Sequence, residues 1–461
     1  MTFRSLLMVC AVIFSSLVGS SRAAASSDVV LEWNQIAVTT MLTPPAASPF
    51  GQARFAAIVQ LAVFEAVNAI THDYQPYLGT ITAPAGASPE AAAVAAAYRV
   101  LRTYFGGSAT TLDAARATSL GAISDGQAKT DGIATGEAAA AAMIALRAND
   151  GSAPLTSNPA GAASPGVWQT TASCGTTGAG AFYNWQNVTP FGVPSAAAFI
   201  LDPPPSLTSE RYTKDYLEVK TFGSMNSTAR PQDRSDVARI YRDTSPTNLL
   251  NSAARQVAGA QGRSLSENAR ALALLNMATS DSLVASFATK YNYNFWRPET
   301  AIHAGATDGN PKTSPDATFV PYIVTPCFPS YPSNHASGTG GGAEVLRRMY
   351  GAGGHTIAIS SPQPLDSAIV LHYTTFKAIT DDVDDARVFG GIHFRFDQEA
   401  GGRMGRDIAT YVVKHNLRSI DNSDSTGLGV NSIERRRVGA ARGSPDQRLP
   451  SRAGSGKSGS A

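Results

Sequence analysis

The segment that most restricts the fold lies near the C-terminal end of the sequence. An apolar residue recurs there at every fourth position: Ile392, Phe396, Ala400, Met404, Ile408 and Val412. A period close to that of the α-helix predicts an amphipathic helix from Ile392 to about Asn416 with one face in a core. The Gly390-Gly391 pair marks the expected start of this helix.

The same segment carries three residues suited to chemistry, which are Arg387, His393 and Asp397. Residues four apart share a helix face, so Asp397 can lie beside the ring of His393 and hold it in one tautomer. A core histidine beside a surface salt bridge is the alternative interpretation of this segment taken alone.

Most of the remaining sequence also predicts helices, and no alternation of apolar and polar residues is strong enough to predict a sheet. Alanine, the best helix former, dominates residues 83–150 and indicates tight helical packing there. Helices are predicted over residues 28–69 (two helices divided by a Pro-Pro turn), 89–103, 109–120, 128–147, 206–224, 231–243, 248–259, 266–290, 333–350, 361–378, 381–389 and 392–416. The predicted fold class is all-α, a helical bundle with long loops over the site.

Five regions follow from these patterns. Residues 1–25 combine Arg4, an apolar run and small residues, which is typical of a secretory signal peptide. We expect an N-terminal helical part at 26–150, a loop-rich connection lying over the site at 151–205, and a C-terminal helical bundle carrying the site at 206–417. Residues 418–461 form a basic tail expected to be disordered. The protein is therefore expected to be secreted or periplasmic.

The formal net charge of +2 is too small to indicate nucleic acid or an anionic membrane as a partner. After the signal peptide, no other segment is expected to be long and apolar enough to cross a membrane. Cys10 would leave with the signal, so Cys174 and Cys327 remain, and after export these two could either pair or stay free. The sequence does not define an oligomeric state.

Two cations are expected near the end of the predicted helix at 266–290. Lys290 and Arg297 are seven positions apart, about two helical turns, so both can point the same way. Pro298 disfavours helix at Arg297 and would leave that side chain at a helix terminus. Two adjacent cations repel each other unless an anion lies between them, so this pair indicates an anion site. The alternative interpretation is that both are basic residues on the protein surface.

Ser333 follows Pro332 and precedes a predicted helix, so its hydroxyl and the free amides after it can form a seat for an anion. His335 would lie on the first turn, directed at that seat, although a histidine here can also be a cap partner. Together with Lys290, Arg297 and Arg387, these groups predict a nest for an oxyanion. Of His335 and His393, one could serve for covalent attachment and the other for proton transfer.

The three segments resemble the K-x6-RP, PSGH and SR-x5-H-x3-D motifs of the vanadium-dependent haloperoxidase and type 2 phosphatidic acid phosphatase superfamily. The haloperoxidase branch of this superfamily is the one resembled by the segments Asn-Phe-Trp-Arg-Pro and Gly-Gly-Ile-His-Phe-Arg-Phe-Asp. The resemblance runs from about Trp33 to Asn416.

The resemblance implies a vanadate cofactor and an enzyme that oxidises chloride or bromide with hydrogen peroxide to hypohalous acid, with a small organic acceptor as a possible further substrate. It also implies roles for named residues. His393 would bond vanadium, His335 would act as acid and base, and Asp397 would orient His393. The vanadate oxygens would be held by Lys290, Arg297, Ser333, Arg387 and the backbone amide of Asn334.

Two positions depart from the motifs, because Asn334 stands where the motif has glycine and Ala386 where it has serine. The amide contact at Asn334 then requires that asparagine accept the local backbone. Phe328 resembles a phenylalanine of chloride-oxidising members, and Phe287, about one turn before Lys290, could line the same halide pocket.

Two alternatives remain open at the level of sequence. Phosphate has the shape and charge pattern of vanadate, so the nest also suits an exported acid phosphatase with a phosphohistidine intermediate, in which His335 would protonate the leaving alcohol. A helical protein that binds an oxyanion without catalysis is the second alternative.

Overall fold

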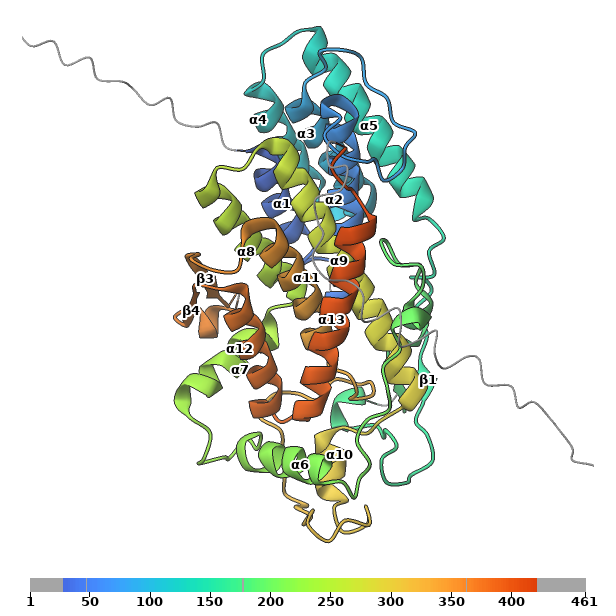
Figure 1. The fold of residues 1–461 in the computed structure, drawn as a ribbon, viewed down its shortest axis with the longest axis vertical. Coiled ribbons are helices and arrows are strands. Elements are labelled where there is room, and N and C mark those ends of the chain that lie inside the picture. The colour runs from blue at the N-terminus through green and yellow to red at the C-terminus, as the bar shows by residue number, and fades with distance from the viewer. Residues whose placement is uncertain (1–27, 47, 176–177, 362, 421–461) are drawn as a thin grey trace, which may run out of the picture. The chain divides into compact units, whose positions relative to one another are not determined.

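The computed structural model describes residues 28–46, 48–175, 178–361 and 363–420, and within these residues the fold is helical, as predicted (Figure 1). The predicted signal peptide at 1–25 and residues 421–461 of the predicted tail lie outside the described residues. The helices are α1 (Val29–Thr40), α2 (Pro49–Thr71), α3 (Pro89–Tyr104), α4 (Ala109–Gly121), α5 (Gln127–Leu146), α6 (Glu210–Phe222), α7 (Gln232–Asp243), α8 (Pro246–Gln261), α9 (Leu265–Tyr293), α10 (Pro298–His303), α11 (Asn334–Tyr350), α12 (Phe376–Phe389) and α13 (Arg395–His415).

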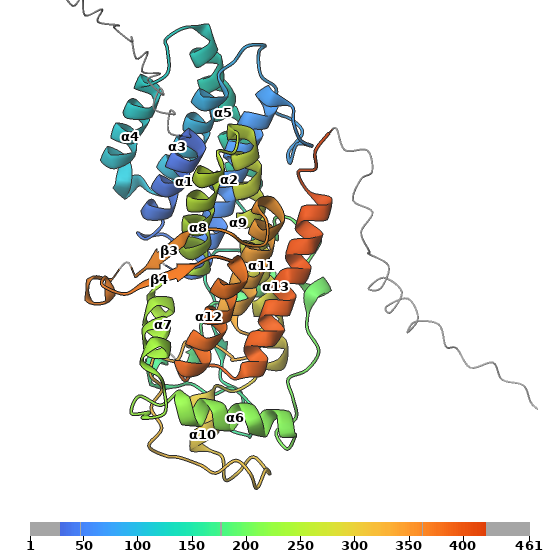
Figure 2. The ribbon, with the colours of Figure 1, turned by 60° about the vertical axis from the view of Figure 1, so that its left-hand side comes forward.

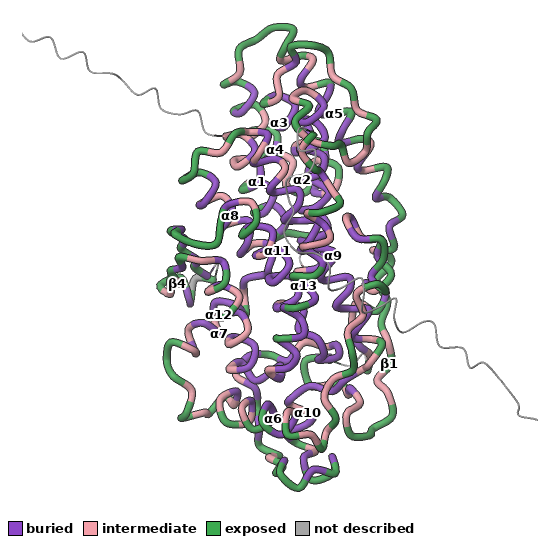
Figure 3. The backbone as a smooth tube through the Cα atoms, viewed as in Figure 1, coloured by how far each residue is buried: buried purple, intermediate pink, exposed green. Residues whose placement is uncertain are grey.

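Two long helices, α2 and α9, lie at the centre of the core and are buried along almost their whole length (Figure 3). By length and composition alone, both helices could span a membrane. This corrects the expectation that no segment after the signal peptide is long and apolar enough to do so. Their most apolar stretches are 94% and 100% buried inside the protein, however. A helix that is apolar on all sides and enclosed in this way is typical of the core of a large domain.

The helices that carry the site, α9, α11 and α13, pack directly against one another. Small residues allow this close approach. A methyl group added at Gly405 of α13 would lie 2.2 Å from the carbonyl oxygen of Ser337 in α11. On the other side of α11, one added at Gly341 would lie 2.5 Å from Ser282 Oγ in α9. The distance from α11 to α13 is therefore limited by backbone contact, and that from α11 to α9 by the contact with Ser282.

The predicted helix at 361–378 is wrong over most of its length. Strands β3 (Ile357–Ser360) and β4 (Val370–Tyr373) pair antiparallel instead, and α12 begins at Phe376 (Figure 2). Residues of β3 are alternately buried and exposed, as expected for a half-buried strand. Four residues are too few to show this period in the sequence. A second small sheet joins β1 (Asn158–Pro159) to β2 (Ala179–Gly180).

Two predicted helix boundaries at the site also differ. Helix α9 continues past Lys290 to Tyr293 and ends at Asn294 in the left-handed conformation, so Arg297 lies beyond the helix in extended backbone. Helix α13 begins at Arg395, not at Ile392, and leaves His393 outside it. The turn before His393 uses Gly391 at φ +82°, where a methyl group would lie 2.3 Å from the carbonyl oxygen of Gly223.

Candidate active site

The predicted site residues come from the ends of five helices that meet in one region. Lys290 is in the last turn of α9, Arg297 precedes α10, and Arg387 is in the last turn of α12. Ser333 caps α11, whose first two residues are Asn334 and His335. His393 lies just before α13, and Asp397 is in the first turn of that helix. Helix termini have free backbone donors and acceptors, which is why polar side chains can be held there inside a helical fold.

His393 is held in one orientation by two neighbours. Its Nδ1 lies 2.8 Å from Asp397 Oδ2 and 3.3 Å from Ser330 Oγ. The same carboxylate oxygen accepts from Ser330 Oγ at 2.5 Å and from the Phe394 amide at 3.1 Å. The expected pairing of His393 with Asp397 is therefore present. It arises from a helix-capping geometry, because His393 precedes the helix instead of lying on its face.

The opposite nitrogen of His393 faces the cations. Nε2 lies 3.0 Å from Arg297 Nη1, and a guanidinium can only donate. Nε2 must then carry the lone pair, and Nδ1 carries the proton that is donated to Asp397. Burial and the nearby cations, Arg297 first, hold the pKa of His393 well below its usual range, so the ring is neutral at pH 7. A neutral ring with Nε2 unprotonated can act as a nucleophile or as a ligand.

The three cations are buried and are anchored by backbone carbonyl groups. Lys290 Nζ donates to the carbonyl oxygens of Pro329 at 2.8 Å and Ser330 at 2.7 Å. Arg297 donates to those of Phe328 and Ile392 at 2.8 and 2.9 Å, and Arg387 donates to that of Tyr241 at 3.0 Å. Carbonyl groups orient these side chains without neutralising their charge.

This accumulation of positive charge is costly without an anion. Burial lowers the pKa of Arg297 to about 9 and that of Arg387 to about 10. Burial and the charge of Arg297 also hold the pKa of Lys290 well below its usual range. Asp397 is the carboxyl group that lies among these cations, and burial raises its pKa. At acidic pH its negative charge therefore offsets less of their positive charge.

Several donors in this region are buried and have no hydrogen-bond partner among the described residues, namely Arg297 Nη2, Arg387 Nε and Asn334 Nδ2. Buried donors without partners are rare in folded proteins. A small oxyanion placed beside His393 Nε2 would accept hydrogen bonds from these groups and offset the charge. The residues present therefore fit a tetrahedral or trigonal oxyanion.

The departure from glycine at Asn334 requires no unusual backbone, because this residue begins α11 in regular helical conformation. Its Oδ1 accepts from Ser286 Oγ at 2.6 Å, which turns Nδ2 the other way. Ser333 Oγ accepts from the Ala336 amide at 3.3 Å and keeps its own proton available for donation. Ala386, at the second departure, is completely buried.

A cavity of about 340 Å³ adjoins these groups. Its polar lining consists of Asn334, His335, Arg387 and His393, which we call its polar floor, and of Arg242. Burial and the charge of Arg387 hold the pKa of His335 well below its usual range, so His335 can accept a proton from a group in the cavity. Of the two residues predicted to form a halide pocket, Phe328 lines this cavity. Phe287 is not among the lining residues and packs behind Phe328, with ring centroids 5.4 Å apart.

Sequence reasoning missed three residues of the site. Ser330 orients both His393 and Asp397, and it lies in the Pro-Ser-Tyr-Pro segment beside the predicted Phe328. Phe50 at the start of α2 and Phe182 in the connection after α5 line the cavity. No local pattern marks these two phenylalanines, since they lie more than 100 residues before the motifs.

Part of the chain is similar in sequence to known proteins. Residues 270–422 match a family described as the vanadium chloroperoxidase second helical-bundle domain. The curated vanadium chloroperoxidase of Curvularia inaequalis is 25% identical over an alignment that covers 34% of this chain and 32% of that protein. The match thus spans about a third of that relative's length.

Solved structures resemble the chain over most of its length. The crystal structure described as the first bacterial vanadium-dependent iodoperoxidase has a TM-score of 0.73 at 23% identity, covering 86% of this chain and 98% of the other. An apo-type bacterial vanadium-dependent chloroperoxidase has a TM-score of 0.63 at 16% identity, covering 79% and 93%. Fold and motif residues together define a helical-bundle protein with an oxyanion nest. Residues 270–422 are thus similar to a domain of this family, and most of the chain shares the fold of these bacterial vanadium-dependent peroxidases.

Proposed function

We propose that this protein is a vanadate-dependent haloperoxidase that oxidises halide, chloride or bromide, with hydrogen peroxide to hypohalous acid. The observation that carries the proposal is the lone pair of His393 Nε2 directed among three buried cations whose donors are only partly used. The relatives named vanadium haloperoxidases support the same assignment.

Vanadate, when bound, would act as a Lewis acid that polarises peroxide for attack by halide. The residues of this chain would have separate tasks in that reaction. His393 would bind through Nε2, while Asp397 and Ser330 keep its proton on Nδ1. Lys290, Arg297 and Arg387 would hold the charged oxygens, joined by the Ser333 hydroxyl and the Asn334 amide.

Proton transfer falls to His335 because it lies at the floor of the cavity and has a depressed pKa. A neutral imidazole can take the proton that peroxide must lose on binding and return it to the leaving oxygen. Phe328 would form part of the place where halide reacts. Its ring lies 5.4 Å from Lys290 Nζ and 5.1 Å from Arg297 Cζ, within the range of cation–π contacts.

The test is to load the purified protein with orthovanadate and measure oxidation of chloride, bromide and iodide by peroxide. We expect oxidation that requires vanadate and is inhibited by phosphate. Hydrolysis of a phosphate ester such as p-nitrophenyl phosphate, without any peroxide-dependent halide oxidation, would instead establish the phosphatase. Absence of both activities would favour oxyanion binding without catalysis.

His393→Ala should abolish halide oxidation, because it removes the ring nitrogen that lies 3.0 Å from Arg297 Nη1 and would bind the cofactor. His372→Ala is the matched control, since His372 is exposed on β4 and should leave the rate unchanged. Undiminished turnover in His393→Ala would show that the site is assigned wrongly.

We further propose that the protein is exported, to the periplasm or the medium. Cys174 and Cys327, which the sequence left either paired or free, form a disulfide, and disulfides persist in oxidising compartments. N-terminal sequencing of the protein recovered after expression with its leader tests this. Cleavage near residue 25 is expected, and an intact Met1 in cytosolic protein would contradict it.

A further inference from the structure

The cavity above the nest has walls of a different chemistry from its floor. Three phenylalanine rings, Phe50, Phe182 and Phe328, face it together with apolar side chains. The apolar set comprises Pro49, Pro246, Leu283, Ile323, Val324 and Pro326. Phe328 alone could serve a halide, and neither halide nor peroxide is large enough to need apolar walls of this extent. A volume of about 340 Å³ is instead that of a site for an organic molecule.

The rings are arranged edge to face and not stacked on one another. Phe50 and Phe182 have centroids 4.8 Å apart at an interplanar angle of 68°, and Phe50 and Phe328 are 5.9 Å apart at 71°. Phe287 supports them from behind, 4.7 Å from Phe50. Aromatic rings favour such edge-to-face contacts, so the walls form a partial cage that a further ring could complete.

Phe182 is held in this cage at a cost in backbone energy. Its φ is +59°, a left-handed conformation that is uncommon for a bulky side chain. Strained backbone of this kind persists where the surroundings fix it, and it concentrates at functional sites. The neighbours of Phe182 are fixed on both sides. The Ala181 carbonyl accepts from Tyr291 Oη at 2.5 Å, and the Tyr183 amide donates to the Thr156 carbonyl at 2.9 Å.

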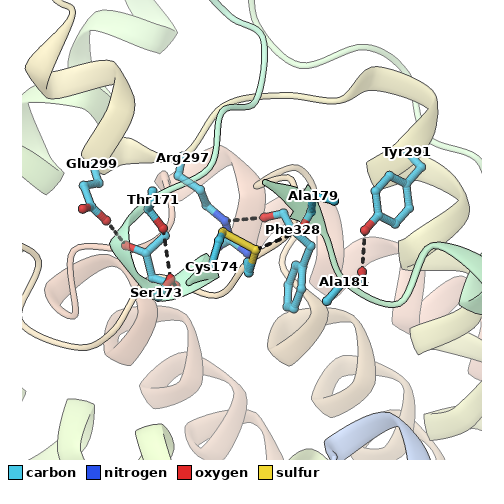
Figure 4. Close-up of a disulfide and its surroundings, with 11 residues drawn as sticks. Thr171, Ser173, Cys174, Ala179, Ala181, Tyr291, Arg297, Glu299 and Phe328 are labelled. Atoms are coloured by element: carbon cyan, nitrogen blue, oxygen red, sulfur yellow. Dashed lines mark hydrogen bonds between the residues drawn. A yellow bond between two sulfur atoms is a disulfide. The ribbon is translucent and has the colours of Figure 1, made fainter. Parts of the chain in front are cut away.

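The connection that carries Phe182 is also bonded to the segment that carries Phe328. The disulfide between Cys174 and Cys327 joins them, and the Ala181 amide donates to the Cys327 carbonyl at 2.8 Å. Figure 4 shows the disulfide, Phe328, Ala181 and Arg297 in one region, with Arg297 donating to the Phe328 carbonyl. Two walls of the cavity and one cation of the nest are therefore linked in a single network.

We propose that this cavity binds a phenol-class aromatic acceptor, its ring against Phe50, Phe182 and Phe328 and its hydroxyl toward His335, and that the acceptor is halogenated there. The inference rests on the proposed function and specifies its organic substrate. The apolar walls suit the ring, and the polar floor of Asn334, His335 and Arg387 suits the hydroxyl. Phe50 and Phe182 are the residues that determine specificity.

The reaction balances with the reagents of the proposed function. The halide loses two electrons, and peroxide gains them as its O–O bond breaks. One aromatic carbon then forms a bond to the halogen and releases its proton. With one further proton from solvent, the products are the halogenated ring and two water molecules.

The experiment has two arms on vanadate-loaded protein. Calorimetry with 2-naphthol, without peroxide or halide, measures binding alone. Turnover with phenol, bromide and peroxide measures the ratio of para to ortho bromophenol against that from reagent hypobromous acid. We expect saturable binding and a ratio that differs from the reagent's, because a held ring presents only some of its carbons.

Phe182→Gly removes the ring while leaving a backbone that glycine adopts without strain. It should weaken naphthol binding about threefold to tenfold, the size of one aromatic contact, and shift the product ratio toward the reagent's. Phe50→Leu, in a different element, should act in the same direction and guards against a folding defect in the first variant. Phe199→Ala is the control, since Phe199 packs on Tyr411 and does not line the cavity.

If the protein oxidises bromide, either of two results would overturn the proposal. One is a para-to-ortho ratio equal to that of reagent hypobromous acid, and the other is 2-naphthol binding that is unchanged in both Phe182→Gly and Phe50→Leu. Loss of bromide oxidation in the unmodified protein would instead refute the proposed function. The binding arm still decides whether the cavity takes the ring.

Discussion

At the scale of single residues, the chemistry depends on which nitrogen of His393 carries the proton. Asp397 accepts a hydrogen bond from Nδ1, and Ser330 Oγ lies 3.3 Å from the same nitrogen. On the other side of the ring, Arg297 donates to Nε2. Both sides of the ring therefore select the same tautomer, and the lone pair is directed at the cations before any ligand arrives. Neighbours that orient a ligating histidine in this way commonly change affinity or activity about 10- to 100-fold when removed.

Asp281 is a buried carboxyl with a structural task. It lies in α9 and accepts backbone amide hydrogens from Phe191, Gly192 and Val193 at 2.7 to 3.0 Å, which attaches the long connection to the core. Burial nevertheless raises the pKa of Asp281 to about 6. This carboxyl therefore binds its proton more tightly in the folded chain than in the unfolded one, where its pKa is about 4.

Folding should then take up a proton at Asp281 between about pH 4 and pH 6, so its contribution to stability falls as pH rises through that interval. A rise in the pKa of Asp281 from about 4 to about 6 corresponds to a loss of about 3 kcal/mol of unfolding free energy. Asp281→Asn cannot titrate, and the stability of the unmodified protein relative to this variant should fall by up to that amount from pH 4 to pH 6. Urea unfolding at several pH values measures the difference, and a gap independent of pH would contradict the expectation.

At the scale of helices, the site depends on the distance between α11 and α13, which carry His335 and Asp397. Gly405→Ala should push these helices apart, because the new methyl group would lie 2.2 Å from the Ser337 carbonyl oxygen and 2.5 Å from the Gly341 amide nitrogen. Overpacking against backbone costs about 1 to 3 kcal/mol. We expect a lower unfolding free energy and reduced halide oxidation.

Gly402→Ala, one turn earlier on the same helix, is the matched control. Its methyl group would meet only the flexible end of Arg406 at 3.2 Å. Alanine is favoured over glycine inside a helix by about 0.5 to 1 kcal/mol, so this variant should be as stable as the parent or more so. Equal losses in both variants would show that helix spacing is not the cause.

The longer helices were predictable from sequence because each repeats its apolar period several times, as α13 does, whereas the six-residue α10 was missed. The four-residue strands β3 and β4 are too short for that and were missed. Boundaries at the site failed for a related reason. The left-handed residue Asn294 and the turn at Gly391 are single positions, and their effect on Arg297 and His393 depends on tertiary contacts.

At the scale of the whole molecule, the motif residues were identifiable because they have fixed spacing within short segments. Of the three phenylalanines in the cavity walls, only Phe328 was identifiable in this way. Phe50 and Phe182 reach the site only through the packing of α2 on α9 and through the disulfide from Cys174 to Cys327. The residues of the oxyanion nest are therefore marked by local sequence motifs, whereas Phe50 and Phe182 are brought to the cavity by tertiary structure.

The nest also couples anion binding to the stability of the folded chain. Lys290, Arg297 and Arg387 are held together only in the folded protein, so an oxyanion that binds among them stabilises this state by mass action. Phosphate at about 100 times its dissociation constant should contribute about 2.7 kcal/mol and raise the denaturation midpoint at matched ionic strength.

Lys290→Met should reduce this gain in stability from phosphate, because it removes one of the buried charges that the anion offsets. Lys377→Met, at a lysine whose side chain is 78% exposed on α12, should retain the full gain. An equal phosphate effect in both variants would mean that phosphate stabilises the protein elsewhere, and thermal unfolding with and without phosphate decides between the two.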